Sequence, residues 1–582
     1  MRAILSRPRM GIAFNALGRA FVVAVLCGQY APAQAAGVVG TGTPASCTSA
    51  ALASAIASGT GNITFACGAA PVTIVIATPG GLVVPSGVYI DMDGANKIEL
   101  SGGLASRVFV VAAGGTLRLN NLSVVKGFSA SDDGGAIRND GRLFIDGCTF
   151  ADNLTTPSFS GGAILTYGEL NISNSEFRNN QAGNGGAIYP RFAAAQTIIF
   201  DTTFDLNFTT STINGWGGAI LVWDGALVTL IRTIFHDNTA RQYGGAILVE
   251  GASILGINAS QFYSNAAQAV SAQGGAIYTQ GTLVIIDSTF HSNHANGNGG
   301  VIFMNAGSTD IRRSTFNANW AGSGGAYQQE AGILTAGESW FYGNGYNPSG
   351  TPVTSYGGAF DISGGAATLT NLTVSGNYAD FGGGLFLNSA SAMQNMTLSG
   401  NHARYGAGLY RFSGDMTLTN VTVYQNSATN GTGGVHQTAG AAGAAVIHNT
   451  IVANNTGADA NGSNVRSLNC DAPFDFFAFN LSSDGSCAFG AGRDNVIIQL
   501  MALANAGGYA PTHVPLPTSP AIDNASNLYC PTDDQRGFLR AGKGSACDVG
   551  SVEYDPTALV LQSVKSRKTH GAAGTFDLTL SP

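Results

Sequence analysis

The carboxylates best placed for acid–base chemistry in this 582-residue chain follow a repeated Gly-Gly-Ala-Ile tetrapeptide at a fixed distance. Asp224 and Glu250 form the best pair, and two carboxylates roughly 5–9.5 Å apart are what a glycoside hydrolase needs. The alternative, which we favour, is a solvated turn with unrelated polar residues. Six residues after the first glycine, the copies carry Tyr167, Arg191, Trp223, Glu250, Gln280, Asn305 and Glu330, with Asp224 one place out of phase.

A second row, four residues after the same glycine, is rich in aromatic and aliphatic side chains. If the isoleucine of the tetrapeptide points into a core, this row points outward, because strand side chains alternate. Exposed aromatic rings beside a polar row predict a surface that binds a sugar or a protein. The alternatives are that a loop covers the row, or that the row is itself core. The residues predicted to bind a ligand are Tyr189, Trp223, Tyr278 and Phe303.

No cofactor or metal site is expected from the motifs. The cysteines form no CxxC pairs, the eight histidines are scattered, and there is neither an HExxH sequence nor a phosphate-binding loop. The net charge is −8, without runs of Lys or Arg, which argues against nucleic acid as a partner. No stretch has the eighteen or more apolar residues of a membrane-spanning helix.

Two signatures alternate through most of the chain and predict its architecture. One is an apolar residue followed three places later by Asn, from Phe150 to Ile451, and successive copies lie between 24 and 33 residues apart. The other is Gly-Gly-Ala-Ile, starting at Gly134 and degrading after Gly274. Short alternating runs between the signatures are typical of strands with one buried face. About twelve copies in register predict a solenoid of stacked coils.

The signature residues suit the corners and core of such a coil. Paired glycines allow the positive φ of a tight corner. The Asn tolerates the left-handed conformation, and its amide can bond the Asn of the next coil. The Phe is expected to point inward and to stack on the Phe one coil away. The fold class is therefore all-β, a right-handed parallel β-helix with a helical N-terminal cap and a disulfide-containing C-terminal cap.

The alternation of Gly-Gly-Ala-Ile with Phe-x-x-Asn resembles the repeats of chlamydial polymorphic outer-membrane proteins, over about residues 71–458. This resemblance implies a β-helix displayed on a surface, and it carries no reaction. A later series, which includes Ser519 to Asp523, Asp534 to Gly537 and Cys547 to Glu553, resembles the closing segment called choice-of-anchor Q. That segment implies surface fixation or sorting.

Composition divides the chain into five parts. Residues 1–35 have the basic start, short apolar run and Ala-Gln-Ala site of a signal peptide. Residues 36–70 are the N-terminal cap, with an amphipathic helix expected over 48–57. Residues 71–458 are the β-helix, and 459–555 are the C-terminal cap. Residues 556–582, in which Phe576, Leu578 and Leu580 alternate, look like the start of a truncated further domain or a tail.

An exported chain permits disulfides. The natural local pairs are Cys47–Cys67, Cys470–Cys487 and Cys530–Cys547, which leaves Cys148 as a buried free thiol. Four polar residues of the C-terminal cap could be mistaken for a catalytic triad, but we expect them to form a hydrogen-bonded network that holds the cap. They are His513, Asp523, Asp534 and Arg536.

The sequence as a whole favours a secreted or cell-surface protein, monomeric and without catalysis, that acts as an adhesin or as a glycan- or protein-binding passenger. An extracellular polysaccharide lyase or glycoside hydrolase is the alternative, since enzymes of both classes adopt the β-helix. A purely structural spacer is a third interpretation. A cluster of acidic and basic residues over adjacent coils would favour an enzyme, and here that cluster is thin.

Overall fold

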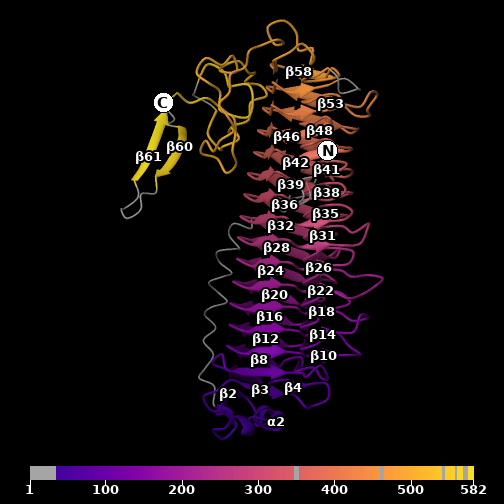
Figure 1. Ribbon diagram of the computed structural model, residues 1–582, viewed down its shortest axis with the longest axis vertical. Coiled ribbons are helices and arrows are strands. Elements are labelled where there is room, and N and C mark those ends of the chain that lie inside the picture. Colours follow the sequence, from indigo (N-terminus) through magenta and orange to yellow (C-terminus); the bar gives the residue numbers. More distant parts are fainter. Residues whose placement is uncertain are drawn as a thin grey trace, which may run out of the picture.

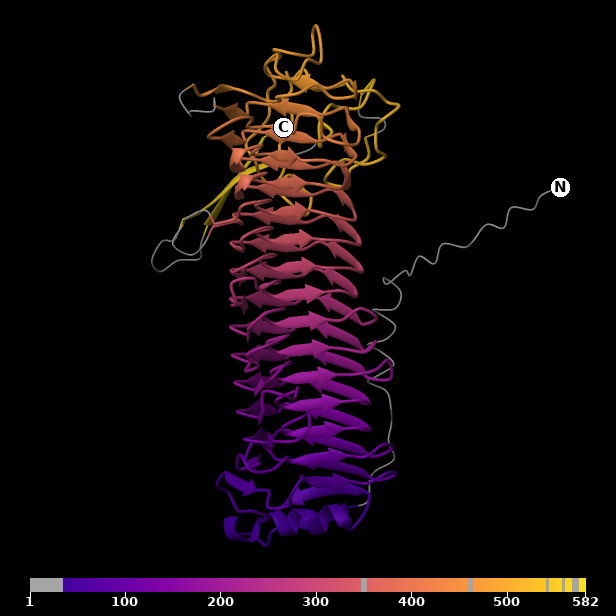
Figure 2. The same ribbon diagram turned by 90° about the vertical axis from the view of Figure 1, so that its right-hand side faces the viewer.

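The computed structural model describes residues 35–346, 353–458, 464–540, 544–556, 560–567 and 575–581. These residues form a rod of stacked parallel coils, as Figure 1 and Figure 2 show from two sides. The predicted parallel β-helix is confirmed. The predicted signal peptide lies outside the described residues, except for its last residue. No helix among the described residues is long and apolar enough to cross a membrane.

Each full coil contributes a strand to three long parallel sheets. The coil around Gly244, for example, contains β27 (Ile247–Val249), β28 (Ile254–Asn258) and β29 (Gln261–Tyr263). We call the three sheets the Gly-Gly sheet, the long-strand sheet and the Phe sheet, after these strands. They run from β4 (Leu82–Val84) to β53 (Val435–Gln437), from β1 (Ala35–Val39) to β58 (Phe476–Ala478), and from β3 (Val72–Val75) to β59 (Leu481–Ser482).

Two smaller sheets stack the two-to-four-residue strands that follow each Asn. One has seven strands, from β10 (Phe128–Ser129) to β34 (His294–Ala295), and includes β30 (Ala266–Ala267). The other has five strands, from β44 (Tyr378–Phe381) to β57 (Arg466–Ser467). In the three long sheets each strand pairs with the equivalent strand one coil away, so equivalent residues form rows along the rod. These rows place every surface feature described below.

The interior contains a stack of phenylalanines, as the sequence predicts. Neighbouring rings lie nearly parallel, with centroids 4.4–5.0 Å apart. All are fully buried on the inner side of the Phe sheet. Valine and leucine take over this position in later coils. The stack comprises Phe150, Phe177, Phe204, Phe235, Phe262, Phe290, Phe316 and Phe341.

A buried ladder of asparagines runs beside the phenylalanines. In each coil the Asn Oδ1 accepts hydrogen bonds from the backbone N–H and the Nδ2 of the preceding Asn, as at Asn238 and Asn265 (3.1 and 3.0 Å). The predicted coil-to-coil amide bond is confirmed. The predicted left-handed conformation of these asparagines is wrong: the residue before each one takes it in most coils, as Asp237 does with φ of 54°.

The two glycines of the corner have different roles. Gly244, the first, has φ of 65°, a conformation that costs glycine little. At Gly245, the second, a Cβ would lie 2.0 Å from the carbonyl oxygen of Gly275 in the next coil. The first glycine therefore makes the turn, and the second lets two coils approach each other.

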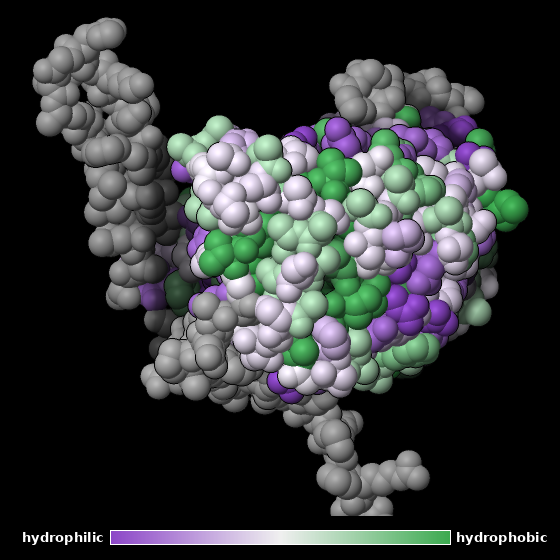
Figure 3. Space-filling view, turned by 90° about the horizontal axis from the view of Figure 1, so that it is seen from below, coloured by the Kyte–Doolittle hydropathy of each residue, from purple (hydrophilic) through white to green (hydrophobic). Residues whose placement is uncertain are grey.

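The N-terminal end of the rod is closed by α2 (Ser49–Ala57), which Thr48 caps by accepting a hydrogen bond from Ala51 N–H. Leu52 and Ile56 of α2 are buried, and the Cys47–Cys67 disulfide flanks the helix. Figure 3 looks onto this end, where apolar side chains lie scattered among polar ones. The expected helical cap thus covers the first coil.

The C-terminal segment divides into two parts. The loop closed by Cys470–Cys487 packs Phe474 against the main core, as does Phe489 just after it, and together they cover the upper end. Residues 496–540 and 544–556 instead lie against the side of the rod, on the outer face of the Phe sheet (Figure 1). Beyond them, β60 (Val560–Arg567) and β61 (Thr575–Ser581) form an antiparallel hairpin, so the predicted strand around Phe576 lies in β61.

Candidate functional site

The predicted ligand-binding row lies on the outer face of the Gly-Gly sheet, but it is covered. Its side chains form an apolar cluster separate from the main core, so the predicted outward direction is right. The predicted exposure is wrong: Tyr189 is 7%, Tyr278 6% and Phe303 1% exposed. Trp223, the fourth predicted residue, is half-buried at the edge of the cluster.

The cover comes from residues on both sides of the row. Trp216 and Tyr243 stand immediately before the first glycine of their coils, and Tyr167 and Trp223 stand after the strand. Trp216 stacks on Trp223 of the same coil, with centroids 5.6 Å apart, and Tyr243 stacks on Tyr278 of the next coil, with centroids 4.7 Å apart. Burial accordingly raises the pKa of the Tyr278 hydroxyl. Face-to-face stacking leaves mainly ring edges outward, so the row offers no flat platform for a sugar.

Well-exposed aromatic side chains do occur at the edge of this face, and one of them lies beside the aromatic row. Phe192, directly after β19 (Ile188–Pro190) and Arg191, is 47% exposed. Its φ is 71°, which is rare for a bulky residue and marks a strained backbone. The Arg191 guanidinium lies 4.9 Å from the centre of the Phe192 ring, and the Tyr167 ring stacks on the Phe192 ring with centroids 5.5 Å apart. We call Arg191 and Phe192 the Arg–Phe knob.

Asp224, one carboxylate of the proposed pair, is bonded to an arginine of the preceding coil. Asp224 occupies a left-handed corner with φ of 55°, and its carboxylate accepts a 2.7 Å hydrogen bond from Arg191 Nε. This bond raises the pKa of Arg191. Asp224 therefore holds the Arg–Phe knob in place.

A polar pair interrupts the apolar row further along the rod. Gln328 in β38 (Tyr327–Gln329) and Asp361 in β41 (Phe360–Ile362) are register partners, 4% and 2% exposed. Burial, with a smaller effect of Glu330, raises the pKa of Asp361 to about 7, although Ser363 donates a 2.6 Å hydrogen bond to its Oδ1. The buried Gln328 Oε1 accepts no hydrogen bond. A neutral Asp361 has the O–H donor that this oxygen lacks.

We expect Asp361→Asn to stabilise the rod more at pH 8 than at pH 5, by about 2–3 kcal/mol, because the loss begins above the unfolded pKa of about 4 and continues to about 7. The folded-state pKa lies above that of the unfolded chain, so the folded protein binds the proton more tightly. The contribution of Asp361 to stability is therefore full at low pH and falls as the pH rises towards 7. Thermal unfolding at both pH values measures this, with exposed Asp380→Asn as the control. Equal shifts at the two pH values would contradict the assignment.

Sequence reasoning missed a group on the outer face of the Phe sheet. Asp205 ends β21 (Thr203–Asp205), His236 ends β25 (Ile234–His236), and the two are register partners. Asp237 follows in the left-handed corner. One ligand atom from each of the three lies within 4.8 Å of the others. Aligning the coils on Phe would have revealed this row, because Asp205 and His236 each follow a Phe directly.

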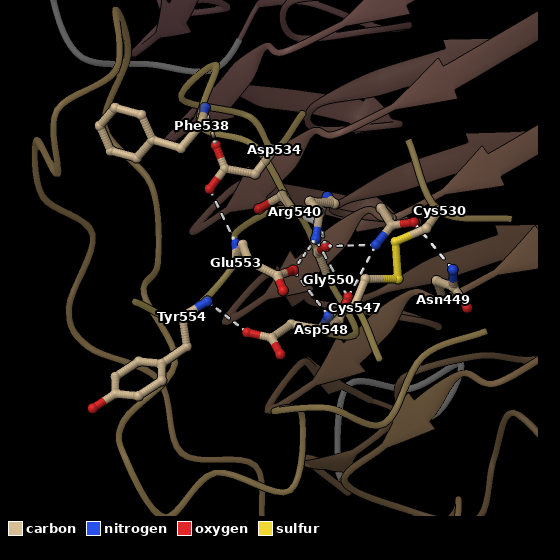
Figure 4. Close-up of polar contacts among 12 residues, drawn as sticks. Asn449, Cys530, Asp534, Phe538, Arg540, Cys547, Asp548, Gly550, Glu553 and Tyr554 are labelled. Carbon is tan, nitrogen blue, oxygen red and sulfur yellow. Dashed lines mark hydrogen bonds and ion pairs between the residues drawn. A yellow bond between two sulfur atoms is a disulfide. The ribbon is translucent and has the colours of Figure 1, made fainter. Parts of the chain in front are cut away.

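The four residues of the C-terminal cap do not form a triad. The buried His513 Nδ1 lies 2.7 Å from the Met501 carbonyl, so Nδ1 donates and Nε2 accepts from Ser399 at 2.8 Å. Burial lowers the pKa of His513. Arg536 donates to Asp534 at 2.7 Å, and Asp523 accepts from Ala546 N–H. These residues belong to the hydrogen-bonded network drawn in part in Figure 4, which is structural.

That network attaches the segment to the rod. Arg540 donates to Glu553 Oε2 at 3.1 Å and to Asn395 Oδ1 of the rod at 3.0 Å. Burial raises the pKa of Glu553 to about 7 and that of Asp548 to about 6. The outward threonines of the rod complete the contact: Thr397 bonds Thr512, Gln535 and Ser551, and Gln535 donates to Thr373.

The remaining disulfide predictions agree with the structure. Cys530 and Cys547 are bonded within the part of the C-terminal segment that lies against the side of the rod, which we call the docked segment (Figure 4). Cys148 is a free, buried thiol, and burial raises its pKa to about 12. A thiol held in its neutral form is a poor nucleophile, so Cys148 has the structural role expected of it.

The stacked parallel coils define the class of the protein, a β-helix repeat protein. Residues 174–189, which contain one Phe-x-x-Asn and one Gly-Gly-Ala-Ile, match the model of the Chlamydia polymorphic membrane protein repeat. The chain is thus a β-helix repeat protein with coils similar to those of the polymorphic membrane proteins.

Two relatives from Chlamydia pneumoniae support this similarity. Probable outer membrane protein pmp20 is 31% identical over 172 residues, which are 27% of this chain and 10% of the relative. Probable outer membrane protein pmp7 is 34% identical over 130 residues, 20% of this chain and 14% of the relative. The matches thus cover about a tenth to a seventh of the relatives' length. Their names support the predicted cell-surface or outer-membrane location. No solved structure matches the chain.

Proposed function

We propose that the protein is a non-catalytic rod displayed at the cell surface, which binds a partner protein through the Arg–Phe knob. The observation that carries this proposal is Phe192, an exposed aromatic ring on a strained backbone beside an arginine fixed by Asp224. Such strain persists only where surrounding structure holds it, and it clusters at binding sites. Arginine and aromatic residues are also the usual anchors of protein interfaces.

The partner's chemistry follows from what the face exposes. Sugars stack on ring faces, whereas the rings beside the knob stack on each other. The ring of Phe192 and the neighbouring edges of Trp223 and Tyr167 instead suit an apolar side chain of another protein. Arg191 and Asp224 are each about one-third exposed, so their ion pair lies at the edge of the proposed contact surface. This arrangement favours the adhesin interpretation over the glycan-binding one.

We expect saturable binding of the labelled full chain to cultured animal cells, and Phe192→Ser to weaken it at least tenfold, or about 1.4 kcal/mol. Phe412→Ser is the matched control, because Phe412 is also 47% exposed and also follows a strand of the Gly-Gly sheet, β49 (Leu409–Arg411). Flow cytometry measures both variants.

Treatment of the cells separates the two partner classes. Protease treatment should abolish binding, and enzymatic removal of surface glycans should leave it unchanged. Binding that Phe192→Ser and Phe412→Ser weaken equally, or that only glycan removal abolishes, would contradict the proposal.

A further inference from the structure

The group of Asp205, His236 and Asp237 has a geometry that its own protons cannot satisfy. His236 Nδ1 lies 2.9 Å from Asp205 Oδ1 and 3.2 Å from Asp237 Oδ2. A ring nitrogen carries at most one hydrogen, and the hydrogen-bond geometry is acceptable only towards Asp237. Asp205 Oδ1 is buried and receives no hydrogen bond, despite its short contact with the ring. Two carboxylate oxygens thus converge on one nitrogen that can serve only one of them.

Other charges on the neighbouring coils do not resolve this conflict. Arg178, the register partner of Asp205 on the preceding coil, forms its ion pair with Glu176, 3.8 Å away. On the following coil Tyr263 stacks on the His236 ring, with centroids 4.9 Å apart and planes 2° apart. This stacking fixes the direction of the ring. Asp205 lies deeper than Asp237, with side chains 20% and 51% exposed.

We infer that Asp205, His236 and Asp237 bind a divalent first-row transition metal ion through two carboxylate oxygens and His236 Nδ1. A cation between these atoms satisfies both carboxylates and accepts the nitrogen lone pair. Nitrogen and oxygen atoms bonded to one such ion at about 2.1 Å lie about 3.0 Å apart at an octahedral right angle and about 3.4 Å apart at the tetrahedral angle of zinc. The two contacts of His236 lie close to this range. One imidazole with two carboxylates suits zinc or manganese better than calcium, which takes oxygen ligands.

The site goes beyond the proposed binding of a partner protein, since it lies on the Phe sheet and the Arg–Phe knob on the Gly-Gly sheet. Its role follows from its ligands: Asp205 belongs to one coil, and His236 and Asp237 to the next. A bound ion therefore links two adjacent coils, through Asp205 on one coil and through His236 and Asp237 on the next. A ligand that binds only the folded state stabilises it, which thermal unfolding detects.

Isothermal titration calorimetry of the metal-free full chain with zinc chloride tests the inference, with calcium chloride as the comparison ion. We expect one zinc ion per chain at this site, at least tenfold weaker binding in Asp205→Asn and in His236→Gln, and no comparable calcium binding. His291→Gln is the matched control, because His291 occupies the same outward row two coils later but contacts Asn317 and Ser292 rather than carboxylates.

Two readouts make the result decisive. Zinc should raise the unfolding temperature of the wild type and of His291→Gln, but not that of Asp205→Asn. Circular dichroism confirms that each variant retains its strands, which is expected because the side chains of Asp205 and His236 point out of the core. Zinc binding that is unchanged in Asp205→Asn and His236→Gln, or that His291→Gln weakens equally, would overturn the inference, as would absence of zinc binding.

Discussion

Asn265→Ala is expected to lower the free energy of unfolding by about 3–5 kcal/mol. The buried Asn265 side chain makes four coil-to-coil hydrogen bonds, to Asn238, Phe235 and Asn293. Alanine leaves the buried Asn238 N–H without its partner and removes one donor from the Phe235 carbonyl, and an unsatisfied buried group costs roughly 1–3 kcal/mol. It also leaves a small cavity. Urea unfolding followed by circular dichroism measures the loss.

The position of Asn265 in the middle of the rod strengthens this expectation. Each coil of a solenoid is stabilised by its two neighbours, so a weakened coil affects both sides. Asn258→Ala is the control, because Asn258 is an exposed Asn at the end of β28 in the same coil. An effect of Asn265→Ala as small as that of Asn258→Ala would show that the ladder does not hold the coils together.

Arg540→Met is expected to release residues 496–540 and 544–556 from the rod while the coils remain folded. Removal of one partner from a buried ion pair costs about 3–5 kcal/mol, because the other charge stays buried. Glu553 is that partner, and the Asn395 side-chain oxygen and the carbonyls of Gly550 and Asp548 each lose one donor as well. Hydrogen exchange of backbone amides should speed up in the docked segment and stay slow in the Phe sheet below it.

A second substitution tests the cause. Glu553→Gln in the Arg540→Met background removes the unpaired carboxylate, so exchange in the segment should slow again in part. Exchange that Arg540→Met leaves unchanged would contradict the role of the ion pair. Exchange that accelerates equally along the whole rod would show that the segment stabilises the coils and not only itself.

The coil itself was predictable because its demands are local. A positive φ and a close approach between coils require glycine, and a stacked interior selects phenylalanine, as at Gly244, Gly245 and Phe262. Outward rows carry no such demand. Thr373 and Thr397 look like any polar strand positions, and only the docked segment reveals that they are an interface.

The sequence did not predict the burial of the aromatic row, for a related reason. Trp216 and Tyr243, which cover the row, stand before the first glycine of their coils, whereas both rows read from the sequence follow that glycine. The ion pair of Asp224 with Arg191 was also invisible, because the partners lie 33 residues apart and out of phase in their coils. Contacts between rows depend on loop lengths, and these vary from coil to coil.

Catalysis on a polysaccharide is the activity that most directly opposes the proposed function. The test is incubation of the full chain with pectin, alginate and glycosaminoglycans, with product formation measured over time for the wild type and Glu250→Gln. A non-catalytic binding rod predicts no turnover by either protein on any of the three. Turnover by the wild type that Glu250→Gln abolishes would contradict this account and establish an enzyme.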